Sequence, residues 1–190
     1  MSLPTDSLDD AASVETVPNA EAFLDKSTAL DAGAADGMLK QLQRARRPLI
    51  LTGPALMTRK SRESTTQLEY VLQIPVIGME SPRGIADPSL GAFSQILAQA
   101  DCVLLLGKRL DFTLKFGMPP AISATCKFLQ IDAEHKENER TQRAMGARFS
   151  ASALAEPVAA AKTLAHCARA RPATKSGWLE ETKAAVAYRP

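Results

Sequence analysis

Charged side chains that could bind a nucleotide follow the apolar runs of this 190-residue chain. The densest group is Arg109 and Asp111, which come directly after the run 102–106 and Gly107. A guanidinium offers a planar set of donors that suits phosphate, and a carboxylate accepts hydrogen bonds from sugar hydroxyls. The alternative is an ion pair between Arg109 and Asp111 that holds the loop. We favour ligand binding, with Arg109 on phosphate and Asp111 on a hydroxyl.

Three other candidate binding residues follow three other apolar runs. Gly53 would let the backbone approach a phosphate, although a plain tight turn is the more common reason for a glycine there. Arg83 could hold an anion, or could pair with Glu80 across the loop. Asp132 could accept hydrogen bonds from ribose or adenine, or could be the N-cap of a helix that begins near residue 134. All of them lie where open α/β sheets bind ligands, outside the carboxyl ends of the strands.

The sequence predicts no catalytic residue and no metal site of its own. His135 and His166 are the only histidines, and no motif supplies either with a nucleophile or a partner carboxylate. Cys102, Cys126 and Cys167 are widely spaced, without the paired cysteines of a zinc site. Cys102 and Cys126 lie in or beside apolar runs and are expected to be buried thiols.

Composition excludes several classes of protein. The formal net charge is only +2, with 45% hydrophobic and 23% charged residues, as in an ordinary globular domain. A nucleic-acid-binding protein would more often show a concentrated basic stripe. No apolar stretch approaches the ~20 residues of a membrane span, and the first residues lack the features of a secretory signal. We therefore expect a cytoplasmic protein with no nucleic acid and no membrane as partner.

Short apolar runs alternate with helical patterns along the chain, as in parallel sheets that are buried on both faces. The candidate strands are 49–52, 75–78, 102–106, 127–132 and, more weakly, 148–150. Helices are predicted from Asp36 as N-cap up to Pro48, over 59–72, around 90–97 and around 158–168. The predicted fold is a doubly wound, Rossmann-like α/β domain in three layers, with a parallel sheet of five or six strands.

The chain is predicted to divide into three parts. Residues 1–28 are acidic, alanine-rich and weakly patterned, which indicates a flexible linker. Residues 29–172 form the α/β domain. Residues 173–190 form a C-terminal connector whose helical stretch carries Trp178 and Leu179. We expect apolar surface to be exposed there, because neighbouring domains would be missing.

Four segments follow one another in a familiar order and spacing: RRPLILTGPAL, IPVIGMESPRGIADPSLGAF, ADCVLLLGKRLDFTLKFGMPP and CKFLQIDAE. They resemble the central domain of thiamine-diphosphate-dependent enzymes, a superfamily that includes acetolactate synthase, benzoylformate decarboxylase and pyruvate decarboxylase. The run LLGKRLDFTLKFGMPP is most similar to the branch of oxalyl-CoA decarboxylase and 2-hydroxyacyl-CoA lyase. The resemblance covers residues 36–164.

The resemblance implies that this chain is one of three α/β domains of a larger lyase or decarboxylase. In that family the first domain supplies a glutamate that activates thiamine diphosphate, and the third carries a GDG…N motif for magnesium and the diphosphate. This sequence contains no GDG. Thiamine diphosphate and magnesium are therefore expected in the parent enzyme only, and the excised central domain is expected to be inactive alone. Its partners would be the flanking catalytic domains, within a homo-oligomer.

The resemblance also implies roles for three of the candidate site residues. Arg109 matches an arginine that contacts phosphates, Asp132 matches the acid that meets the adenosine half, and Gly53 matches the first glycine after the opening strand. At this domain acetolactate synthase binds FAD and the oxalyl-CoA branch binds ADP or part of CoA, while other members of the family leave it empty. Pro54 stands where a glycine or alanine is common, and the Gly-Asp that often follows the last strand is missing near Phe149. These departures disfavour tight binding of FAD and favour a structural or weak adenosine site.

Two other functions remain open. A free-standing NAD-type module, of the sirtuin-like or deoxyhypusine-synthase-like kind, shares a similar sheet, but the sequence has neither a zinc-binding cysteine set nor a glycine-rich dinucleotide fingerprint. An interaction domain without any ligand is the third hypothesis. A nucleotide that stabilises the chain would exclude this third hypothesis.

Overall fold

The sheet contains five parallel strands in the order β2-β1-β3-β4-β5. The structure is a computed structural model that describes residues 19, 28–169 and 177–189. The strands are β1 (Pro48–Thr52), β2 (Val76–Gly78), β3 (Cys102–Leu106), β4 (Lys127–Asp132) and β5 (Phe149–Leu154). The predicted doubly wound parallel sheet is thereby confirmed. The flexible linker predicted for 1–28 lies almost wholly outside the described residues.

The strand sequences are apolar where the sheet is buried on both faces. Every residue of β1 and β3 is buried, and the two strands pair from Pro48 with Cys102 to Thr52 with Leu106. β5 lies at the edge of the sheet, and partly buried residues alternate with exposed ones along it. This half-buried alternation carries a weaker apolar signal, which explains why the sequence indicates the last strand only weakly.

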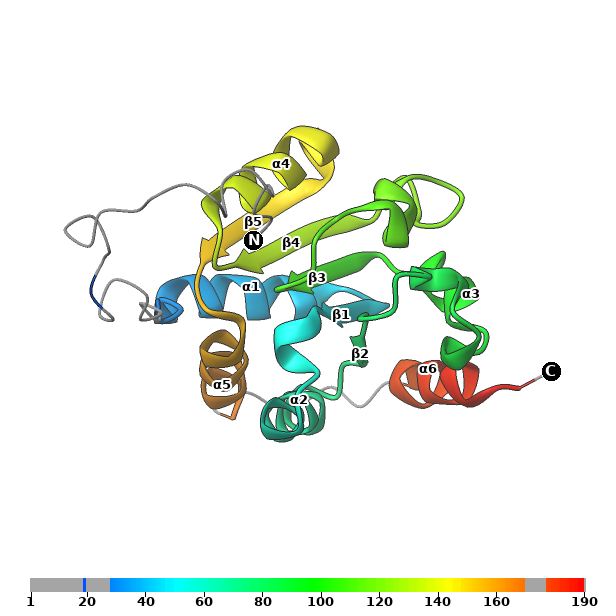
Figure 1. The fold of residues 1–190 in the computed structure, drawn as a ribbon, viewed down its shortest axis with the longest axis horizontal. Coiled ribbons are helices and arrows are strands. Elements are labelled where there is room, and N and C mark those ends of the chain that lie inside the picture. The colour runs from blue at the N-terminus through cyan, green and yellow to red at the C-terminus, as the bar shows by residue number, and fades with distance from the viewer. Residues whose placement is uncertain (1–18, 20–27, 170–176, 190) are drawn as a thin grey trace, which may run out of the picture.

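Helices cover both faces of the sheet (Figure 1). Within the described ranges they are α1 (Ala32–Arg44), α2 (Arg59–Leu72), α3 (Phe93–Leu97), α4 (His135–Met145), α5 (Pro157–Ala168) and α6 (Gly177–Ala187). α1, α2 and α5 pack on one face, over a core that includes Leu39, Leu104 and Leu164. The other face has its own core, which includes Leu51 and Phe93. None of the described helices is long and apolar enough to cross a membrane.

Helix α1 begins earlier than the sequence predicts. Its N-cap is Asp31, whose carboxylate accepts a hydrogen bond from the Ala34 N–H at 2.9 Å. Asp36, the predicted N-cap, lies inside the helix and pairs with Lys40 at 2.7 Å. The prediction is wrong because the alanines of the first turn carry no apolar periodicity, so the helical pattern becomes visible only near Met38.

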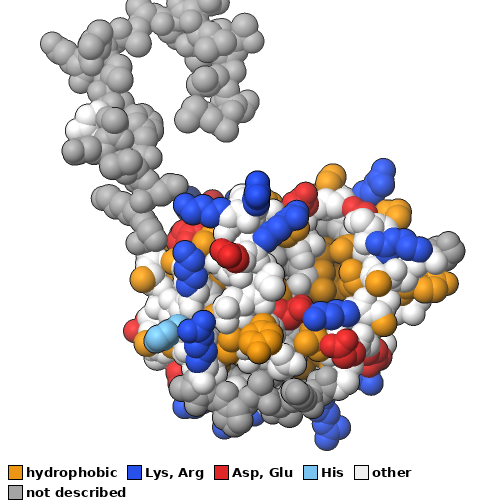
Figure 2. Space-filling model, turned by 90° about the horizontal axis from the view of Figure 1, so that it is seen from below, with side chains coloured by type: hydrophobic (Ala, Val, Ile, Leu, Met, Phe, Trp, Pro, Cys, Tyr) orange, Lys and Arg blue, Asp and Glu red, His pale blue; other side chains and the backbone are white. Residues whose placement is uncertain are grey.

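Figure 2 shows the outer side of the layer that contains α2 and α5, where Lys and Arg side chains are prominent. Arg59, Lys60 and Arg62 stand on α2, and Lys162 stands on α5. Tyr70 of α2 is 74% exposed. The apolar residues of both helices face the sheet instead, as expected of amphipathic helices in an outer layer.

Helix α6 packs against the domain. Trp178 and Leu179 are 4% and 5% exposed, and the Trp178 indole N–H donates to Pro48 O at 2.8 Å. Lys183 adds an ion pair with Glu69 of α2 at 2.8 Å. The expectation of exposed apolar surface at Trp178 and Leu179 is wrong, because α6 covers the part of the second face that lies beside β1.

The three cysteines differ in burial, and this gives the first testable prediction. Cys102 and Cys126 are buried, and this burial raises the pKa of each thiol to about 12. Because the thiolate is the reactive form, we expect an alkylating reagent near pH 8 to modify the partly buried Cys167 first. Peptide mass spectrometry measures the order. Rapid modification of Cys102 in the folded chain would contradict the structure.

Candidate functional site

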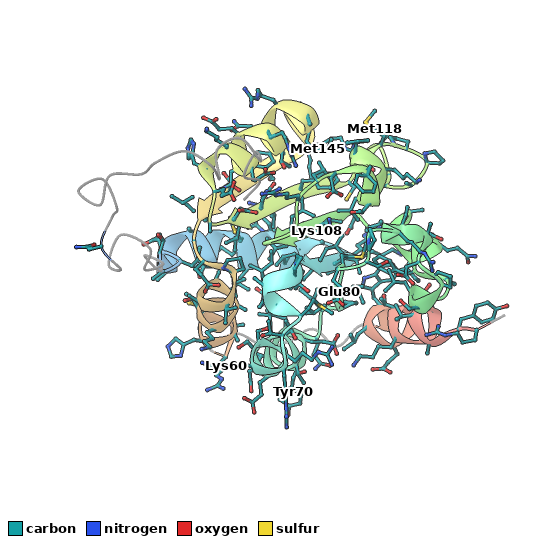
Figure 3. All side chains as sticks on the ribbon, viewed as in Figure 1. Lys60, Tyr70, Glu80, Lys108, Met118 and Met145 are labelled. Atoms are coloured by element: carbon teal, nitrogen blue, oxygen red, sulfur yellow. The ribbon has the colours of Figure 1, made fainter. Side chains whose placement is uncertain are left out.

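An open cleft of about 560 Å³ lies at the carboxyl ends of the strands. The loops after β1, β2, β3 and β4 all line it. Glu80 and Lys108, which Figure 3 labels, come from the loops after β2 and β3. The chain runs from β1 out to β2 and then returns past β1 to β3, so the strand order reverses at this point. Ligands of open α/β sheets bind at such a switch point, which makes this cleft the candidate site.

Arg109 lines the cleft and faces carboxylates of the α4 region. Its side chain is 55% exposed, its Nη2 lies 3.4 Å from Glu134 Oε1, and its Nε lies 3.4 Å from Glu137 Oε1. The alternative predicted from the sequence, an ion pair between Arg109 and Asp111, is wrong because a different cation engages Asp111. The pair with Glu134 is exposed on both sides, and exposed ion pairs of this length are weak. A role of Arg109 in ligand binding stays a prediction.

Asp111 also lines the cleft, and it belongs to a network around Lys108 that the sequence did not reveal. Lys108 is 5% exposed, and its ammonium donates to Thr113 Oγ1 at 2.8 Å and lies 3.3 Å from Asp111 Oδ1. The Thr113 N–H and hydroxyl both donate to Asp111. Burial raises the pKa of Asp111, but these hydrogen bonds and the Lys108 charge outweigh it and bring the pKa below its ordinary value. Asp111 therefore has a structural role in fixing the loop after β3.

Asp132 is the third predicted residue that lines the cleft. It is 8% exposed, and its Oδ1 accepts a hydrogen bond from the Glu134 N–H at 3.0 Å. The N-cap of α4 is Glu134, and the helix begins at His135. Asp132 is thus not the N-cap that the sequence suggested, because its carboxylate supports the turn before the helix. This hydrogen bond uses one of the two carboxylate oxygens of Asp132. A carboxylate can accept several hydrogen bonds, so further acceptor sites are left on Asp132.

Gly53 lies at the end of β1 but is not among the residues that line the cleft. A Cβ at this position would lie 1.7 Å from Gly107 O, so a larger residue does not fit. The Gly53 N–H donates to Leu106 O at 3.1 Å, which continues the pairing of β1 with β3. Close packing of two backbones accounts for this glycine, and its amide is already used within the sheet.

Arg83 also lies outside the cleft lining, whereas Glu80 lines it. The Arg83 N–H donates to Ser81 Oγ at 3.2 Å. Hydrogen bonds from Ser81 and Ser89, together with the charge of Arg83, lower the pKa of Asp87 to about 2. The structure therefore places Arg83 in the electrostatic surroundings of Asp87, and a role in ligand binding stays a prediction.

The fold and the cleft define the chain as a doubly wound α/β domain with its candidate site at the switch point. Its sequence matches the family described as "Thiamine pyrophosphate enzyme, central domain" over residues 35–156. This match covers more than half of the chain, so the chain belongs to this family. The resemblance stated from the sequence is confirmed.

The relatives of the chain include enzymes whose names refer to CoA esters. It is 31% identical to 2-hydroxyacyl-CoA lyase 1 of Mus musculus over 96 residues, which covers 48% of this chain and 16% of the relative. It is 33% identical to oxalyl-CoA decarboxylase of Escherichia coli (strain K12) over 101 residues, or 50% of this chain and 18% of the relative. The chain thus matches less than a fifth of the length of either enzyme.

Solved structures confirm the fold. An X-ray structure of an enzyme from Mycobacterium smegmatis, assigned to the thiamin diphosphate-dependent class, superposes with a TM-score of 0.55. The sequence identity is 16%, and the superposition covers 76% of this chain and 29% of the other. A likeness at this identity supports the α/β fold and carries no further conclusion about ligands.

No group of three or more His, Cys, Asp or Glu side chains that could hold a metal ion occurs in the described ranges. His135 lies 3.4 Å from Glu139 on α4, its side chain is 71% exposed, and it is not among the residues that line the cleft.

Proposed function

We propose that the chain is the central domain of a thiamine-diphosphate-dependent carbon–carbon lyase or decarboxylase, and that its cleft holds an adenine nucleotide. Two kinds of support exist for this proposal. The relatives that match are named 2-hydroxyacyl-CoA lyase and oxalyl-CoA decarboxylase. The cleft lies at the switch point of a doubly wound sheet, where nucleotides bind in this class of fold.

The position of Arg109 carries the nucleotide part of the proposal. Its guanidinium lies at the carboxyl end of β3, is about half exposed, and is held by two weak ion pairs. It would bind the diphosphate. Asp132, buried at the carboxyl end of β4, would accept hydrogen bonds from the adenosine half. Pro54 lines the same cleft and offers no N–H to a phosphate, which favours a weak adenosine site over tight binding of FAD.

The remaining role would be structural. A chain that matches less than a fifth of its relatives would act in the parent enzyme as a spacer between the flanking catalytic domains. It would also support a homo-oligomer. In this proposal the flanking domains supply the thiamine diphosphate site, and the chain alone has no lyase activity.

Thermal unfolding with ADP, CoA, FAD, NAD and thiamine diphosphate tests the nucleotide site. A ligand at ~100 times its dissociation constant stabilises by about 2.7 kcal/mol, or about 5–10 °C in a domain of this size. We expect such a rise with ADP or CoA, and we expect Arg109→Ala to abolish it. The control Arg143→Ala removes an exposed arginine of α4 that does not line the cleft, and should keep the rise.

Other outcomes would decide against parts of the proposal. A rise with NAD alone would favour a free-standing NAD-type module. No shift with any ligand would reduce the chain to a spacer or interaction domain and would remove the roles given to Arg109 and Asp132.

A further inference from the structure

Arg109 is shared between two carboxylates, one just before α4 and one in its first turn. Glu134 lies 3.4 Å from Nη2, and Glu137 lies 3.4 Å from Nε. Strong hydrogen bonds between such charged groups measure about 2.7–2.9 Å, so both contacts are loose. A phosphate that binds the Nε–Nη2 edge of Arg109 must replace these carboxylates, and a phosphate at the remaining N–H groups is still repelled by both of them. Glu134 and Glu137 are therefore competitors for the group that would hold the ligand.

The cleft as a whole carries an excess of negative charge. Its lining includes four carboxylates and two cations: Glu80, Asp111, Asp132, Glu134, Lys108 and Arg109. The buried ammonium of Lys108 is already committed to Asp111 and Thr113. Among the lining residues this leaves Arg109 alone to attract an anion, against several carboxylates that repel it. Each further negative charge on a ligand therefore weakens its binding here.

The two carboxylates can release Arg109 without leaving a buried charge unpaired. Glu137 is nearly buried, with 11% of its side chain exposed, but it retains Arg140 at 2.8 Å. Glu134 is 62% exposed and returns to water when Arg109 turns away. An uncompensated buried charge would make the exchange very costly. Because Glu137 keeps the charge of Arg140 beside it and Glu134 returns to water, the exchange avoids the penalty of an uncompensated buried charge.

We propose that Glu134 and Glu137 form a carboxylate gate over Arg109, which selects phosphate ligands of low charge. This proposal rests on the nucleotide site proposed above and names its ligand class more closely. A diphosphate esterified at both ends carries one charge on each phosphate. The terminal phosphates of ADP and ATP are further ionised at pH 7, because the second pKa of a phosphate monoester is about 6. The gate favours the doubly esterified diphosphate.

Calorimetric titration of the whole chain with ADP-ribose, ADP and ATP tests the gate. ADP-ribose should bind most tightly and ATP least. Glu134→Gln should tighten the binding of ADP about three-fold and that of ATP more, because one charge that repels the phosphates is lost. The effect is modest because an exposed ion pair is weak. ADP-ribose should gain less than ADP. Raising the salt concentration should reduce these differences, because the charges are screened.

The matched control is Glu139→Gln, which removes the same charge from the exposed side of α4, where Glu139 faces His135. It should change the affinity for each ligand by less than about two-fold. An equal gain in affinity from both variants, or no gain from Glu134→Gln, would overturn the gate. The nucleotide site would still stand in that case if the normal chain binds the ligands. No binding to either the normal chain or Glu134→Gln would overturn both proposals. Binding only after Glu134→Gln would support the gate most directly.

Discussion

Replacing Gly53 with alanine is expected to destabilise the chain by at least about 3 kcal/mol, a fall of about 6 °C or more in melting temperature. The added Cβ would lie 1.7 Å from Gly107 O and 2.6 Å from Gly107 C. Both are backbone atoms that follow β3, so they cannot move away without separating β1 from β3. These strands are neighbours inside the sheet and are wholly buried. Thermal or denaturant unfolding measures the loss.

Gly37→Ala is the matched control for this substitution. Gly37 lies inside α1, and a Cβ there would meet nothing within 4 Å. Alanine favours a helix over glycine, so this variant should gain about 0.5–1 kcal/mol. Opposite signs for the two variants would isolate the backbone contact as the cause. If Gly53→Ala proved as harmless as Gly37→Ala but weakened ADP binding, the glycine would serve the ligand and not the sheet.

The strands could be predicted from the sequence because a parallel sheet buried on both faces needs continuous apolar runs. The run at 102–106 is the clearest, and β3 is fully buried. Helix α2 could be placed from the pattern of residues 59–72, and the structure adds Thr58 as its N-cap, whose side chain accepts a hydrogen bond from the Ser61 N–H. The start of α1 could not be found in the same way, since alanine is compatible with both faces of a helix.

The candidate site could be predicted only as a place and a set of residues. Topology brings Arg109, Asp111 and Asp132 together, because the carboxyl ends of parallel strands meet at one edge of the sheet. Their partners depend on tertiary contacts. Glu134 is 25 residues from Arg109 in the sequence, and only the position of α4 brings the two charges together. The burial of Lys108 also has no sequence signal, since lysine is usually exposed.

The docking of α6 could not be predicted from the sequence either, because Trp178 and Pro48 are 130 residues apart in the sequence. Nothing in a short helix near the end of a sequence says which surface it will cover. Its hydrogen bond to a strand end becomes evident only when β1 has been placed.

Trp178→Ala is expected to lower the free energy of unfolding by about 3–5 kcal/mol. The side chain is 4% exposed, and its N–H donates to Pro48 O at 2.8 Å. The Arg47 guanidinium carbon also lies 5.5 Å from the centre of the ring, a distance typical of a cation–π contact. The truncation leaves a cavity over β1 and removes both polar contacts. Denaturant unfolding, monitored by a signal that reports on the whole sheet, measures the effect.

The control for this prediction is Tyr188→Ala. The Tyr188 side chain lies just beyond α6 and is 56% exposed, so its removal should change the free energy of unfolding by less than about 0.5 kcal/mol. Hydrogen exchange adds a second readout. Amides of α6 should be protected together with those of β1 in the normal chain and lose protection in Trp178→Ala. A large, cooperative loss would extend the folding unit to Ala187, beyond the family match that ends at residue 156. A small loss confined to α6 would instead make this helix a detachable connector.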